Sequence, residues 1–151
     1  MPEPDAFLLN TDSVFIDATS YWNLVDYQNT RGGLFVDLNK DGALDLVRSS
    51  IQEPVSIFYG TEKTNNWITI SLNQEGMNRH GIGSLVELTI DEQQYTQWVT
   101  SGTSLASGNP PLLHFGLGKA ENIDTIQVYW PTGESTSISD VDINQHLNIT
   151  R

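Results

Sequence analysis

The chain contains no cysteine and few basic residues, and each of these features excludes a class of function. Its 151 residues include 7 Lys and Arg against 19 Asp and Glu, which gives a formal net charge of −12. A chain this acidic cannot neutralise phosphates over a broad surface, so we expect it to bind neither nucleic acid nor anionic lipid. The lack of cysteine excludes disulfides, thiolate metal sites and cysteine nucleophiles.

Long apolar runs are also missing. No stretch approaches the roughly 20 apolar residues that cross a membrane, so we expect no membrane span. The first residues, MPEPDAF, contain neither the basic nor the apolar region of a signal peptide. Either the chain is cytoplasmic, or its signal was removed or lies outside this sequence.

The apolar residues that are present alternate with polar ones in short stretches rich in Val, Ile, Thr, Tyr and Trp. This period of two, interrupted by Gly, Asn, Asp and Pro, predicts an all-β protein with helix limited to a turn or two. The composition changes at the polar stretch 60–66, where we divide the chain into units 1–62 and 66–151. Strands are expected near 13–17, 32–37, 44–48, 55–60, 67–73, 83–90, 94–101, 111–116, 124–130, 134–139 and 145–150.

An acidic loop between two of these strands predicts a calcium site. Oxygen-bearing side chains occupy its positions 1, 3, 5 and 9, and Gly42 at position 6 permits a sharp turn. Ca²⁺ prefers six to eight oxygen ligands, which such a spacing can wrap around one centre. An EF-hand is excluded, because Arg48 stands at position 12 where that loop needs a bidentate Glu. The candidate ligands are the side chains of Asp37, Asn39, Asp41 and Asp45 and the carbonyl of Ala43.

The first unit combines Phe15–Thr19, Arg31–Asp37 and the acidic loop that follows. In these segments it resembles the FG-GAP or VCBS repeat of integrin-type β-propellers. It implies one propeller-like antiparallel blade with a calcium-binding hairpin loop. Only one such repeat is present, which excludes a whole propeller.

The second unit contains six strings that match one known domain. They are Asn66–Ile68, His80–Gly83, Ser101–Ser104, Leu113–Gly118, Ile123–Asp124 and Val128–Gly133. Through these strings the unit resembles the ASPIC/UnbV domain, which follows such repeats in its family. The resemblance implies a β-sandwich, and the two families together imply extracellular placement and adhesion-like roles. From strand alternation we expect the core of this unit to contain Trp67, Ile70, Leu72, Leu85, Leu88, Val99, Leu113, Phe115, Ile126, Val128 and Ile149.

Other motifs do not support an enzyme. Residues 102–106 are similar to the string around the nucleophile of subtilisin-like proteases, but the chain is too short for that fold and lacks its other motifs, so we assign no catalytic residue. His80, His114 and His146 show no metal-ligand spacing, and His114 is expected in the core. Asn148 begins an Asn-Ile-Thr sequon and is a candidate glycosylation site.

Together these features predict a non-enzymatic, calcium-stabilised extracellular structural or adhesion protein. Its expected partners are further copies of itself, as a homo-oligomer or a fibre, or other surface proteins and glycans. The segment 6–17 could add a strand to the blade within its own chain or in the next copy. One alternative is a calcium-dependent carbohydrate-binding module, which neighbouring exposed aromatics would favour. A small hydrolase, which would need two converging acids in a cleft, is another.

Overall fold

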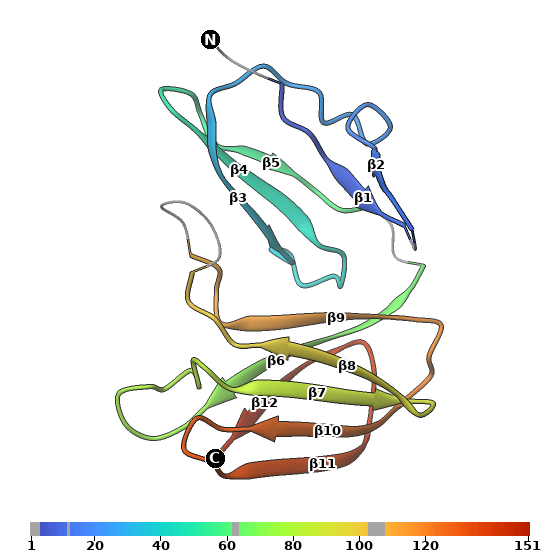
Figure 1. The fold of residues 1–151 in the computed structure, drawn as a ribbon, viewed down its shortest axis with the longest axis vertical. Coiled ribbons are helices and arrows are strands. Elements are labelled where there is room, and N and C mark those ends of the chain that lie inside the picture. The colour runs from blue at the N-terminus through green and yellow to red at the C-terminus, as the bar shows by residue number, and fades with distance from the viewer. Residues whose placement is uncertain (1–3, 12, 62–63, 103–107) are drawn as a thin grey trace.

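The computed structural model describes residues 4–11, 13–61, 64–102 and 108–151, and within them the protein is all-β (Figure 1). The closest approach to a helix is a single turn at 18–22, where Trp22 N donates to the Ala18 carbonyl at 3.0 Å. No helix in the described part of the chain is long and apolar enough to cross a membrane.

The N-terminal unit contains a three-stranded antiparallel sheet and a separate hairpin. The sheet has the order β3-β4-β5, formed by β3 (Thr30–Val36), β4 (Asp45–Ser50) and β5 (Ser56–Phe58). The hairpin pairs β1 (Leu8–Asn10) with β2 (Phe15–Asp17). The sequence predicted β2 but not β1. Neither strand joins the three-stranded sheet of its own chain, so the prediction that segment 6–17 adds a strand within the chain was wrong.

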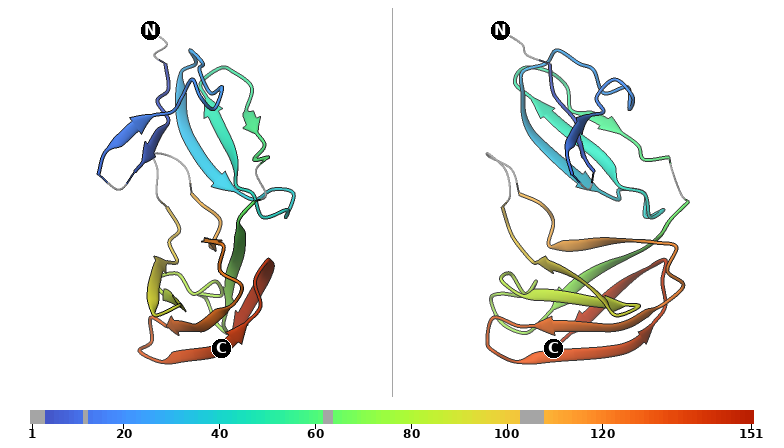
Figure 2. Two further views of the ribbon diagram at one scale, coloured as in Figure 1. Left: turned by 90° about the vertical axis from the view of Figure 1, so that its right-hand side faces the viewer. Right: turned by 45° about the vertical axis from the view of Figure 1, so that its right-hand side comes forward.

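The C-terminal unit is a sandwich of two sheets, seen edge-on in the left view of Figure 2. One sheet has the order β11-β10-β7-β8 and the other β12-β6-β9. Their pairs are antiparallel except for β12 and β6, which run parallel. The strands are β6 (Asn66–Asn73), β7 (Leu85–Ile90), β8 (Gln93–Trp98), β9 (Leu112–Gly118), β10 (Ile123–Tyr129), β11 (Ser135–Val141) and β12 (Gln145–Thr150).

The hydrophobic core lies between these two sheets, and its buried cluster is drawn from residues 68–149 alone. Strand alternation places Ile68 of β6 and Val86 of β7 inward, where both are fully buried. Their neighbours Trp67 and Leu85 were expected in the core but are only partly buried, because they lie on the outer faces of the same strands. The other nine expected core residues are buried.

Candidate metal site

The acidic loop connects β3 to β4 and is organised around the carboxylate of Asp37. Asp37 Oδ1 accepts the N–H of Asp41 at 3.0 Å, and its Oδ2 accepts the N–H of Gly42 at 2.8 Å. Gly42 adopts a φ of 91°, a conformation that L side chains rarely adopt. The Asp37 side chain is only 4% exposed. The first candidate ligand is therefore an enclosed carboxylate whose orientation is fixed by the loop's own backbone.

Asp45 holds the other end of the loop and is fully buried. Its Oδ2 accepts the N–H of Leu38 at 2.9 Å, and its Oδ1 accepts the N–H of Gly60 at 2.9 Å. One carboxylate thus joins the start of the loop to the residues that follow β5. Asp45 has a structural role whether or not a metal binds.

Asn39 and Asp41 are more accessible and contact each other. Asn39 Nδ2 donates to Asp41 Oδ2 at 2.8 Å, and Asp41 Oδ1 accepts the N–H of Ala43 at 3.0 Å. Among the described residues, no group of three His, Cys, Asp or Glu side chains is placed to hold a metal ion. The donors of the loop are instead the carboxylate and amide oxygens of four side chains, a set that suits a hard cation such as Ca²⁺. A carboxylate oxygen that accepts one N–H keeps a second lone pair for a cation.

The loop lies against the outer face of the sheet β12-β6-β9. The register of this sheet places His146, Thr69 and His114 side by side on three strands. The ring of Trp67 stacks on His114 at 6.0 Å and 11°, and meets His146 edge-on at 4.9 Å. His146 Nε2 lies 4.0 Å from Asp37 Oδ2. The structure therefore brings together two histidines, a tryptophan and the first candidate ligand.

His114 corrects an expectation from the sequence. It is partly exposed rather than in the core, and its Nδ1 lies 3.2 Å from Thr69 Oγ1. Burial lowers the pKa of the His114 imidazole, the negative charge of Asp37 opposes that shift, and His146 adds to it. We expect His114 to be neutral at physiological pH, because its pKa falls below the ordinary value of 6.5. His80 lies in an exposed turn.

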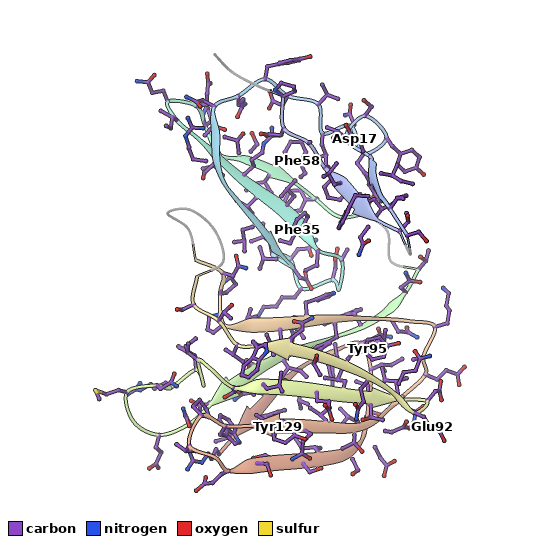
Figure 3. All side chains as sticks on the ribbon, in the orientation of Figure 1. Asp17, Phe35, Phe58, Glu92, Tyr95 and Tyr129 are labelled. Carbon is purple, nitrogen blue, oxygen red and sulfur yellow. The ribbon has the colours of Figure 1, made fainter. Side chains whose placement is uncertain are left out.

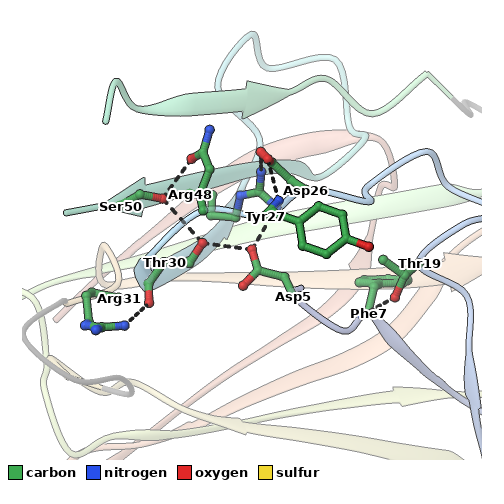
Figure 4. A network of polar contacts seen from close by, with 10 residues as sticks. Asp5, Phe7, Thr19, Asp26, Tyr27, Thr30, Arg31, Arg48 and Ser50 are labelled. Atoms are coloured by element: carbon green, nitrogen blue, oxygen red, sulfur yellow. Dashed lines mark hydrogen bonds and ion pairs between the residues drawn. The ribbon is translucent and has the colours of Figure 1, made fainter. Parts of the chain in front are cut away.

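A second polar cluster, which the sequence did not predict, surrounds Arg48 of β4 (Figure 4). The Arg48 side chain is 5% exposed, its Nη1 pairs with Asp5 Oδ2 at 2.8 Å, and its Nη2 pairs with Asp26 Oδ2. Its guanidinium also lies over the Phe58 ring, 5.0 Å from the centroid. Thr30 Oγ1 extends the cluster by donating to Asp5 Oδ2 at 2.8 Å. These contacts fasten the segment before β3 to the three-stranded sheet.

Two other candidates from the sequence are the glycosylation site Asn148 and the protease-like string 102–106. Asn148 is exposed on β12, where its Oδ1 accepts a hydrogen bond from Ser71 Oγ at 3.2 Å. Most of the protease-like string, Thr103–Ala106, lies outside the described residues.

Comparison with known proteins identifies the C-terminal unit. Residues 74–151 match the family described as ASPIC and UnbV. The chain is 32% identical over 125 residues to cartilage acidic protein 1 of Xenopus tropicalis, and 30% identical to the proteins of the same name in Mus musculus and Homo sapiens. Each comparison covers 78% of this chain and 19% of the relative. The chain thus spans about a fifth of the length of these curated relatives.

Proposed function

The chain belongs to the ASPIC and UnbV family, and from this membership we propose that it is a non-enzymatic, calcium-stabilised structural or adhesion module that works outside the cell. Its similarity to cartilage acidic protein 1 supports this proposal. The chain is itself acidic, with a net charge of −12. Extracellular location is part of the proposal, because the chain spans only 19% of those relatives.

The observation that carries the calcium proposal is the enclosure of two carboxylates in one short loop. Asp45 is fully buried and the Asp37 side chain is 4% exposed, so both charges have lost most of their hydration. Burying a carboxylate is costly unless hydrogen bonds or a counter-charge compensate. Backbone N–H groups supply part of that compensation here. A divalent cation held by the loop would supply the rest.

In this proposal the loop residues have distinct tasks. Asp37, Asn39, Asp41 and Asp45 provide side-chain oxygens and Ala43 its carbonyl. Asp45 keeps the loop closed through Leu38 and Gly60, while Gly42 permits the turn. Calcium itself supplies positive charge that relieves the repulsion among the carboxylates. The affinity expected for such an extracellular module is roughly 10⁻⁵ to 10⁻³ M.

Calcium titration of metal-stripped protein tests this function. Binding to the folded state alone should raise the melting temperature, by several degrees once calcium exceeds the dissociation constant about a hundredfold. Asp41→Ala should abolish the rise, because it removes a ligand side chain while leaving Asp37 and Asp45 intact. Glu121→Ala, an exposed acidic residue away from the loop, is the matched control and should keep it. If the wild type shows neither a heat of calcium binding nor a higher melting temperature in calcium, the proposal is contradicted.

The cavity beside the two histidines is too small for a substrate. It lies between Asp37, Thr69, His114 and His146 and has a volume of about 50 Å³. Pockets that take small-molecule substrates usually measure roughly 300 Å³ or more. This cavity has room for water but not for a substrate.

Self-association through the N-terminal unit is a further part of the proposal. The hairpin exposes apolar side chains, with Phe15 69% and Val14 57% accessible. An open cavity of about 380 Å³ lies between the three-stranded sheet and the segments that flank the hairpin. It is lined in part by Phe7, Phe35 and Phe58. Figure 3 labels Phe35 and Phe58 in this unit. Exposed apolar surface of this kind supports contact with a second copy of the chain.

Sedimentation at increasing concentration, with calcium present, tests self-association. Phe15→Glu should shift the protein toward monomer, because it places a charge on the exposed hairpin. Met77→Glu makes the same change at an exposed apolar residue in a turn of the C-terminal unit and should leave association unchanged. A wild type that stays monomeric at high concentration would contradict this part of the proposal and leave the calcium site unaffected.

A further inference from the structure

The outer face of the sheet β11-β10-β7-β8 presents an ordered set of polar and aromatic side chains. This sheet is the nearer layer of the sandwich in Figure 1, and the left view of Figure 2 agrees. On β7, Val86, Leu88 and Ile90 point into the core, so the alternate residues point outward. Cross-strand register then aligns three outward rows: Ser135, Tyr129, Leu85 and Trp98; Ser137, Gln127, Glu87 and Thr96; Ser139, Thr125, Thr89 and Gln94.

The face is almost uncharged, although the chain is strongly acidic. None of its twelve side chains is buried, and Glu87 is the only acidic or basic residue among them. Its Oε1 accepts a hydrogen bond from Gln94 Nε2 at 3.3 Å. Apart from this carboxylate, the second and third rows consist of hydroxyl and amide groups. They offer donors and acceptors without net charge.

Two exposed aromatic rings stand in the first row. Trp98 of β8 is 61% exposed and Tyr129 of β10 is 44% exposed, with Leu85 of β7 between them. They are two strand spacings apart, which is about 10 Å. Neither ring takes part in an aromatic pair within the described part of the chain. Figure 3 labels Tyr129 on this sheet. Both rings are therefore accessible for stacking on a ligand.

We propose that this face binds a neutral polysaccharide. Trp98 and Tyr129 stack on the C–H faces of two sugar rings along the chain. The Ser, Thr and Gln side chains of the neighbouring rows bond sugar hydroxyls. Acidic polysaccharides are disfavoured as ligands, because a protein with a net charge of −12 repels them. A protein partner fits less well, since the core of a protein interface is normally apolar and Leu85 is the one aliphatic residue in the three rows.

This site is separate from the calcium loop. The loop packs on the outer face of the other sheet, where Gly42 meets Trp67 of β6. No residue of the three rows belongs to the loop. Polysaccharide binding is therefore expected in EDTA as well as in calcium, and its failure would be distinct from a failure of the calcium proposal.

Depletion from solution by insoluble cellulose and chitin tests the inference with the full-length chain. Wild type should bind one of these neutral polymers, and Trp98→Ala and Tyr129→Ala should each weaken binding by roughly three- to tenfold. Tyr95→Ala is the matched control: Tyr95 is 43% exposed on the same strand as Trp98 but alternates to the opposite face. It should bind like wild type. Melting temperatures of all variants establish that each is folded.

Four results would overturn the inference. The first is no retention of wild type on either polymer, and the second is unchanged retention of the Trp98→Ala, Tyr129→Ala double variant. The third is stronger retention on an acidic polymer such as polygalacturonate. A wild-type oligomer that the double variant converts to monomer would instead assign the face to contact between copies, which also overturns it.

Discussion

The backbone of Gly42 lies directly against the indole ring of Trp67. A Cβ atom built on Gly42 would fall 1.9 Å from Trp67 Nε1, so no side chain fits there without movement. Through this contact the acidic loop of the N-terminal unit rests on a tryptophan near the start of β6 in the sandwich. The sequence indicated that Gly42 permits a sharp turn. The structure gives Gly42 a second role, in the packing of the two units.

Gly42→Ala should destabilise the protein by about 2 to 4 kcal/mol, because it adds a steric clash to an unfavourable φ. Gly133→Ala is a matched control: its φ is 92°, close to the 91° of Gly42, but no atom lies within 4 Å of the position that a Cβ atom would take there. The control should lose only about 1 to 2 kcal/mol. Urea unfolding followed by tryptophan fluorescence measures both. Equal losses would show that the Trp67 contact contributes nothing.

Arg48→Met should lower the free energy of unfolding by about 2 to 4 kcal/mol, since it leaves two aspartates without their cation. We expect a loss at the lower end of this range, because the Asp5 and Asp26 side chains are each 32% exposed and water can solvate them. Hydrogen exchange should also accelerate in residues 5–10. Arg31→Met removes an exposed arginine bonded to its own neighbour and should change stability by less than about 0.5 kcal/mol. Comparable effects of the two variants would contradict the role of Arg48.

The all-β fold could be predicted from the sequence because strand alternation is a local signal. Alternation also places His114 outward, since Leu113 and Phe115 on either side are buried. The expectation that His114 is a core residue was therefore wrong for a reason visible in the sequence. The meeting of His114 with His146 could not be predicted, because it depends on how β9 and β12 pair with β6.

The Arg48 cluster could not be predicted for a similar reason. Asp5 and Asp26 lie 43 and 22 residues from Arg48, so no short motif connects them. The hairpin β1–β2 was also only half predicted, because Leu8–Asn10 is too short for a clear alternation. Both features depend on long-range packing.

Stability should fall as the pH is lowered below about 6.5, in part through His114. Its pKa is lowered in the folded protein, first by burial, so the unfolded state takes up the proton before the folded state does. Proton uptake by the unfolded state favours unfolding. His114→Gln should lose less stability than wild type between pH 8 and pH 5, measured by urea unfolding in EDTA. His80→Gln, in an exposed turn, should follow the wild-type profile, and a His114→Gln profile parallel to wild type would contradict the assignment.

Residues 66–151 should fold on their own. The buried core cluster contains residues of this segment alone, and every strand of the two sandwich sheets comes from it. Among the described residues of the N-terminal unit, only Ala18 and Ala43 are buried and apolar, so residues 1–65 alone should not unfold cooperatively. Circular dichroism and thermal melting of the two fragments measure this. The isolated C-terminal fragment should melt cooperatively but at a lower temperature than the whole chain, because Trp67 loses its contact with the loop. A disordered spectrum for residues 66–151 would show that the N-terminal unit is required for the sandwich to form.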